Sequence, residues 1–147
     1  MQRRHGGGFT LIELVVVVTI LTVLAAFALP RFSLLDSQAR SSAVTSLAGS
    51  LYGASALAFA QYDSLGTAPT QVTLDGVTVT LVNGYPDVNG IVSAVQDASG
   101  FSTTASATTV TFSTNSAPTP ANCSVAYTVS PAIGTAPTIA APITSGC

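Results

Sequence analysis

The hydrophobic pattern of the chain is uneven, and its first part differs from the rest. An apolar run of 21 residues extends from Phe9 to Leu29 and carries one charged residue, Glu13. As a helix, a run of this length spans about 31 Å, which matches the roughly 30 Å hydrocarbon core of a bilayer. The run therefore predicts a membrane-length helix. A carboxylate near its start needs a reason, because hydrocarbon disfavours an unpaired charge.

The helical pattern continues beyond the apolar run. Pro30 has no backbone N–H to donate to the preceding turn, which predicts a bend or loosening of the helix at that point. Apolar residues then recur at steps of three, four, three and four along one stripe, namely Val44, Leu47, Leu51, Ala54 and Ala58. We expect one helix from about Thr10 to about Tyr62, with its second half packed on a head.

Past Gly66 the pattern changes to the alternation of β-strands. Apolar and polar residues alternate from Val72 to Leu81 around Asp75-Gly76, which predicts a hairpin with a type I′ turn. Residues 91–96 fit a short helix or an irregular segment. Further strands are expected at residues 108–113, 124–129 and 138–140, the last at a sheet edge because prolines flank it. The predicted fold class is α+β, a long helix on an antiparallel sheet.

The charge distribution excludes one class of partner. Only 7% of the 147 residues are charged, and the basic ones, all Arg, lie in the first forty positions. From Ser41 onward the charged residues are four aspartates. Nucleic-acid binding needs Lys or Arg to neutralise phosphates, so we expect no nucleic-acid partner.

Two cysteines, Cys123 and Cys147, favour one disulfide in an exported chain. A redox or metal-binding pair is the alternative, but there is no CxxC motif and no histidine nearby. The pair therefore indicates maturation in an oxidising compartment.

The sequence gives little support for catalysis or for metal binding. His5 is the single histidine, and no Ser or Thr has an evident activating partner. Asp87-Val88-Asn89-Gly90 resembles the first half of a calcium loop, but the closing Glu is absent, and a simple turn is favoured. We predict no enzymatic activity, no catalytic residues, no cofactor and no metal.

The start of the chain carries a more specific pattern. Arg3 and Arg4 precede three glycines, and Gly8-Phe9-Thr10-Leu11-Ile12-Glu13 leads into the apolar run. This stretch resembles the processing site of type IV prepilins. The resemblance implies that a dedicated peptidase cuts between Gly8 and Phe9 and methylates the new amine of Phe9. The resemblance also implies that Pro30 lies at the position where the family's long helix has its kink. An ordinary signal anchor with a chance glutamate is the alternative.

The resemblance extends in patches to the rest of the chain. Residues 30–58, residues 82–95, Asn122 to Thr128 and the final Ser-Gly-Cys are similar to type IVa major pilins of the mannose-sensitive haemagglutinin type. The resemblance implies the ladle-shaped pilin fold, closed by a C-terminal disulfide loop between Cys123 and Cys147. The expected segments are a leader at 1–8, a transmembrane and filament-core helix at 9–30, a head-packed helix at 31–62, and a β head at 63–147.

The function implied by this resemblance is that of a structural subunit of a type IV pilus, used for surface adhesion or motility. Its head would face the periplasm from the inner membrane before assembly, and it would lie in an extracellular filament afterwards. The implied partners are further copies of the chain, the prepilin peptidase and the assembly machinery. Glu13 would pair with the Phe9 amine of a neighbouring copy. The alternatives are a type II secretion pseudopilin or minor pilin, and a membrane-anchored periplasmic binding domain or enzyme.

Overall fold

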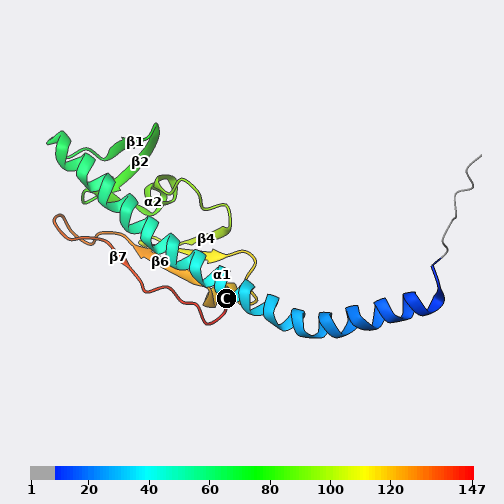
Figure 1. Ribbon diagram of the computed structural model, residues 1–147. Coiled ribbons are helices and arrows are strands. Elements are labelled where there is room, and N and C mark those ends of the chain that lie inside the picture. The colour runs from blue at the N-terminus through cyan, green and yellow to red at the C-terminus, as the bar shows by residue number, and fades with distance from the viewer. Residues whose placement is uncertain (1–8) are drawn as a thin grey trace, which may run out of the picture. The chain divides into compact units, whose positions relative to one another are not determined.

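The computed structural model describes residues 9–147, and only the backbone of residues 29–32. The chain divides into two compact units, the first ending at Asp36 and the second covering Ser37–Cys147. A single helix, α1 (Leu11–Leu65), contributes to both units (Figure 1). Its bounds agree with the predicted helix, and its backbone is helical through Pro30. The bend expected at Pro30 stays a prediction.

The first sheet is built from two tight hairpins in succession. Strands β1 (Gln71–Leu74) and β2 (Val77–Val82) pair antiparallel, with Leu74 opposite Val77. Asp75 and Gly76 between them have φ values of 48° and 81°. Both central residues of a type I′ turn have positive φ, so the predicted hairpin and its turn are confirmed.

A second hairpin, which was not predicted from the sequence, follows at once. Asn83 and Gly84 have φ values of 54° and 88° and connect β2 to the short strand β3 (Tyr85–Pro86). Asn-Gly is the strongest short signal for this turn, so the dipeptide could have indicated it. Phe59 of α1 stacks on Tyr85 of β3 with ring centroids 4.5 Å apart, which fixes β3 against the helix.

A short helix and a second sheet complete the head. Helix α2 (Val88–Ala94) begins three residues before the segment in which a helix was considered. The second sheet has the antiparallel order β4-β5-β6-β7, with a 3-10 turn η1 (Pro120–Asn122) before β6. Its strands are β4 (Phe101–Ala105), β5 (Thr109–Thr114), β6 (Ser124–Thr128) and β7 (Thr138–Ile139). The last three were predicted, including the edge position of β7, whereas β4 was not.

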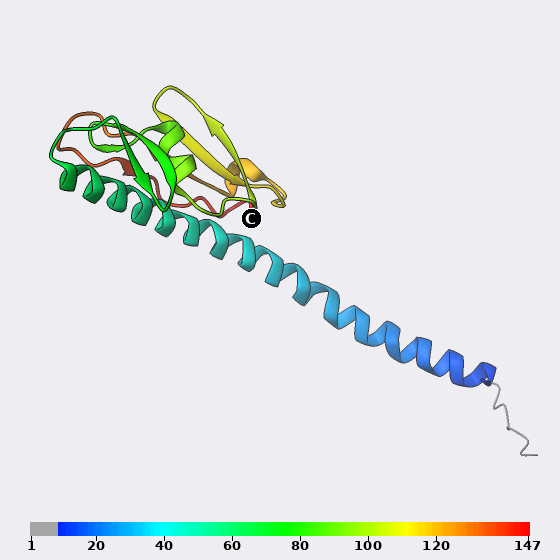
Figure 2. The ribbon, with the colours of Figure 1, turned by 90° about the horizontal axis from the view of Figure 1, so that it is seen from above.

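The second half of α1 supplies one wall of the core. Val44, Leu47 and Leu51 are buried against the second sheet and α2, together with Ile91, Val110, Phe112, Val125, Tyr127 and Ile139. Ala58 lies in a smaller cluster with Val72 and Val79 of the first sheet. Figure 2 shows both sheets on the same side of this part of α1. The predicted apolar stripe is therefore the face that packs on the head, and the fold is the pilin-like α+β arrangement of a long helix on antiparallel sheets.

Two polar contacts connect the first sheet and its turn to β6 and to the segment that follows β6. The buried hydroxyl of Tyr127 in β6 donates to the backbone carbonyl of Pro86 in β3 at 2.8 Å. The side-chain amide of Asn83 donates to the carbonyl of Ser130 at 2.9 Å. Both acceptors are backbone carbonyls in buried residues, which need a donor when they are removed from water.

Candidate assembly site at the start of the long helix

The first turn of α1 is closed by a capping box. Thr10 precedes the first helical residue, and its hydroxyl accepts a hydrogen bond from the Glu13 backbone N–H at 3.3 Å. In return, the Glu13 carboxylate oxygen Oε2 accepts from the Thr10 backbone N–H at 3.0 Å and from the Thr10 hydroxyl at 2.8 Å. This reciprocal pattern satisfies two donors that a helix start otherwise leaves without partners. Glu13 thus has a partner within its own chain.

This local role was not among the expectations from the sequence, which treat Glu13 only as a partner for another copy. The signal was present, because Thr10-x-x-Glu13 directly before an apolar run is the capping-box pattern. The local role does not use all of the carboxylate. Both bonds go to Oε2, and a carboxylate offers about four acceptor sites on its two oxygens.

The surroundings of this carboxylate are apolar and open. Phe9, Ile12, Val16 and Val17 line a hollow of about 360 Å³ beside Glu13. Phe9 is 84% exposed, and the large apolar side chains onward to Phe27 are exposed as well. Within the described residues, α1 is the one helix long and apolar enough to cross a membrane, and none of its most apolar window is buried. Such a surface requires lipid or other apolar helices around it.

The other predicted site residues are outside the described part of the chain, are described by backbone alone, or belong to the second unit. Gly8, the expected cleavage residue, lies outside the described residues, and so does His5. Pro30 belongs to the stretch described by its backbone alone. Cys123 and Cys147 belong to the second unit.

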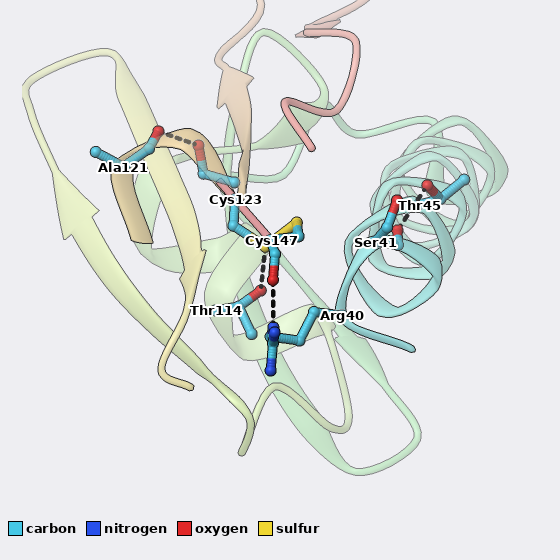
Figure 3. Close-up of a disulfide and its surroundings, with 8 residues drawn as sticks. Arg40, Ser41, Thr45, Thr114, Ala121, Cys123 and Cys147 are labelled. Carbon is cyan, nitrogen blue, oxygen red and sulfur yellow. Dashed lines mark hydrogen bonds between the residues drawn. A yellow bond between two sulfur atoms is a disulfide. The ribbon is translucent and has the colours of Figure 1, made fainter. Parts of the chain in front are cut away.

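The predicted disulfide is present between Cys123 and Cys147. Cys123 is fully buried and Cys147 nearly so, both in the core under α1. Figure 3 shows Arg40 of α1 reaching the bridge, where its Nε donates to the Cys147 carbonyl oxygen at 2.5 Å. The Thr114 hydroxyl lies 3.4 Å from the sulfur of Cys123. The disulfide and Arg40 together attach the last residues of the sequence to both the sheet and the helix.

The segment that resembled half a calcium loop has a structural role. Asp87 is the N-cap of α2, where its Oδ1 accepts from the Gly90 backbone N–H and from the Thr80 hydroxyl, each at 2.6 Å. The described residues contain no group of three or more His, Cys, Asp or Glu side chains that could hold a metal ion. The favoured turn interpretation is thereby refined to a helix cap.

Comparison with known proteins identifies the first part of the chain only. Residues 3–29 match the Prokaryotic N-terminal methylation motif. No curated protein matches the chain, and no solved structure does. The match covers the capping box and the apolar half of α1, so the head is described by its own structure alone.

Proposed function

We propose a function from one premise: the N-terminal methylation motif marks this chain as a type IV pilin-like protein, a pilin or a pseudopilin, and proteins of this family are structural and not enzymatic. The motif implies processing by a prepilin peptidase and assembly into pilus-like filaments. The apolar helix is consistent with anchoring in the inner membrane before assembly. On this premise, we propose that the protein is the major subunit of a type IV pilus that serves surface adhesion or motility.

The observation that carries the proposal is the exposed apolar surface of α1 from Phe9 to Phe27. In a membrane this surface contacts lipid, and in a filament the same surface contacts the helices of other copies. An exposed apolar helix and a separate head can make heterologous contacts, which continue into a helical polymer and do not close into a ring. One helix thus serves both as the anchor and as the filament core.

We further propose that the peptidase cuts between Gly8 and Phe9 and that the amine of Phe9 is methylated. Residues 1–8 are then the leader, 9–30 the transmembrane and filament-core helix, 31–62 the head-packed helix, and 63–147 the head. The capping box supports this assignment, because the helix begins at Leu11 and leaves Phe9 outside it. A residue outside a helix can be cleaved without first opening helical hydrogen bonds.

Glu13 is proposed as the partner of the Phe9 amine on a neighbouring copy. An unpaired ammonium or carboxylate is disfavoured in an apolar filament core, and pairing the two neutralises both charges there. The capping box fixes the position of the carboxylate through Oε2, so the carboxylate is held in place before another copy arrives. The pair would then select the axial register between neighbouring helices.

Two substitutions at Glu13 separate the assembly role from the capping role. Glu13→Gln retains the capping-box hydrogen bonds but removes the charge, whereas Glu13→Ala removes both. We expect both variants to be exported and cleaved, with a mature chain that begins at Phe9 by mass spectrometry, and neither to form filaments. Abundant filaments from Glu13→Gln, with none from Glu13→Ala, would assign Glu13 to helix capping and refute the charge pairing.

The choice of a major pilin rests on the head. The Cys123–Cys147 bridge closes the end of the head covalently, which favours a pilin over a pseudopilin with a calcium-closed loop. The sequence patches of the head also lead us to propose the type IVa pilins of the mannose-sensitive haemagglutinin type as its subgroup. Electron microscopy of sheared surface fibres, with mass spectrometry of their main band, tests this choice. If the main subunit is a different protein, this chain is a minor pilin. If the surface fibres lack this chain, it is a pseudopilin.

A further inference from the structure

The two sheets of the head have four edges, and β4 is the edge strand best suited to pairing. Proteins commonly protect edge strands with prolines, charges or short length. Pro86 lies in β3, two prolines flank the two-residue β7, and Asp75 follows β1 directly. By contrast, β4 has five residues, Phe-Ser-Thr-Thr-Ala, with no proline and no charge. Threonine also favours extended strands.

The hydrogen bonding of the β4–β5 hairpin defines which backbone groups face outward. Ser106 N–H donates to the Thr109 carbonyl at 2.8 Å, and Asn115 N–H donates to the Gly100 carbonyl at 3.0 Å. These bonds lie at the two ends of the same antiparallel register, in which hydrogen-bonded and non-hydrogen-bonded pairs alternate. Ser102 and Thr104 therefore bond to β5.

It follows that the backbone N–H and C=O groups of Thr103 and Ala105 point away from the sheet. Among the described residues, no hydrogen bond to these outward groups is found. Ser102, Thr103, Thr104 and Ala105 are all exposed side chains. The hairpin lies on the side of the head away from α1 in Figure 2, so the helix does not cover this edge.

The charge pattern indicates what could pair with this edge. The sequence contains no Asp, Glu, Lys, Arg or His from Ala98 to Cys147, so the whole second sheet is free of charged side chains. The acidic residues of the head lie earlier in the chain, at Asp63, Asp75, Asp87 and Asp97. Because the second sheet carries no charged side chain, two copies of this chain can pair their β4 strands without placing like-charged side chains of this sheet opposite each other.

We propose that β4 is a homotypic pairing site, at which the β4 strands of two copies join antiparallel into one continuous sheet. The match is self-complementary when Thr104 lies opposite Thr104 of the second copy. In that register each Thr103 exchanges two hydrogen bonds with Ala105 of the other copy, so four bonds use all of the outward groups of these residues. Because the two β4 edges are identical, a second copy of the chain is sufficient as the partner.

The symmetry of this contact sets its role in a filament. A pair that uses the same patch on both copies is isologous and closes after two copies, so it cannot extend a helical polymer. If the chain assembles as proposed above, the β4 contact joins heads of two separate filaments. That role rests on the proposed function, whereas the pairing of two heads does not.

The test uses the unassembled full-length chain in detergent micelles, so it is independent of filament formation. Thr104→Cys is compared with Thr78→Cys, which introduces a thiol at an exposed position of β2 in the other sheet. Under mild oxidation, we expect roughly tenfold more disulfide-linked dimer from Thr104→Cys, since directly opposed strand residues lie within disulfide range. The Thr78→Cys control measures random collision and any dimerisation driven by α1.

A second variant tests whether strand pairing is the cause. Thr103→Pro removes an outward N–H but no bond to β5, and proline is tolerated where the N–H of an edge strand faces solvent. Added to Thr104→Cys, it should reduce the dimer to the level of Thr78→Cys. The proposal is overturned if Thr104→Cys gives no more dimer than the control while its thiol reacts freely with a maleimide, or if Thr103→Pro leaves the dimer unchanged in a protein that retains its Cys123–Cys147 bridge.

Discussion

Replacing Tyr127 by Phe removes a single oxygen atom from the contact between the two sheets of the head. The Tyr127 side chain is fully buried, and its hydroxyl donates to the carbonyl of Pro86 at 2.8 Å. Pro86 pairs with Leu81 of β2. The adjacent bond from Asp87 N–H to the Thr80 carbonyl makes the Leu81–Pro86 pair a non-hydrogen-bonded one. The Pro86 carbonyl therefore points away from β2 and towards Tyr127.

The expected magnitude follows from this geometry. Without the hydroxyl, the Pro86 carbonyl stays buried and loses its donor, and a buried acceptor left without a partner costs about 1–3 kcal/mol. For a head of this size the melting temperature should fall by about 4–13 °C, given an unfolding entropy of about 2.1 cal/mol/K per residue. The change should preserve the packing of the ring.

Tyr52→Phe is the matched control. Its hydroxyl also donates to a backbone carbonyl, that of Ile139 at 3.3 Å, but the side chain is 57% exposed and water can replace the bond. We expect a loss below about 0.5 kcal/mol for this surface change. Thermal unfolding of both variants, followed by circular dichroism in the same detergent, compares them. Equal melting temperatures for the two variants would show that the hydroxyl of Tyr127 does not hold the sheets together.

The same hydroxyl predicts how stability depends on alkaline pH. Burial raises the pKa of Tyr127 above its ordinary value, and the nearby negative charge of Asp87 raises the pKa further. The folded head thus holds this proton more tightly than the unfolded chain, whose Tyr pKa is about 10. The contribution of the Tyr127 hydroxyl to stability is complete below about pH 10. Above that pH, the free energy of unfolding falls by up to about 1.4 kcal/mol per pH unit. Denaturation of wild type and Tyr127→Phe at pH 9 and 11 should show the steeper loss in wild type, and parallel losses would contradict the assignment.

Two further substitutions test the closure and packing of the head. Cys147→Ser opens a loop with a sequence separation of 24. Chain entropy predicts a loss of roughly 3.5 kcal/mol in the free energy of unfolding, measured with urea. An unchanged urea midpoint would show that Arg40 and the core hold the end of the chain without the disulfide. Gly90→Ala would place a Cβ atom 2.1 Å from the Thr80 carbonyl oxygen, so we expect the free energy of unfolding to fall by roughly 2 kcal/mol or more. Gly100→Ala is the control, because no atom lies within 4 Å of its added Cβ, and it should change the free energy of unfolding by less than about 1 kcal/mol. Similar urea midpoints for the two variants would refute the steric reasoning.

Much of the fold could be predicted because its signals are local. The Asp75-Gly76 turn depends on the φ angles of two residues, and the stripe that includes Val44 and Leu51 depends on the period of the helix. A chain with two cysteines permits one intramolecular bridge, so the Cys123–Cys147 pairing followed from composition. The capping box was equally local and was missed because Glu13 was interpreted only through its possible partner on another copy.

The membrane-length helix, the N-terminal methylation motif, the first hairpin and the disulfide could all be predicted from the sequence alone, since each depends on neighbouring residues or on residue type. The tertiary structure decided the features that depend on distant segments. β4 has no regular alternation of apolar and polar residues, and it is a strand because β5 pairs with it. Its exposure as an edge, and the contact of Tyr127 with Pro86, arise only when segments far apart in the sequence pack together. No local pattern encodes such contacts, because their free energy depends on which groups the completed fold removes from water.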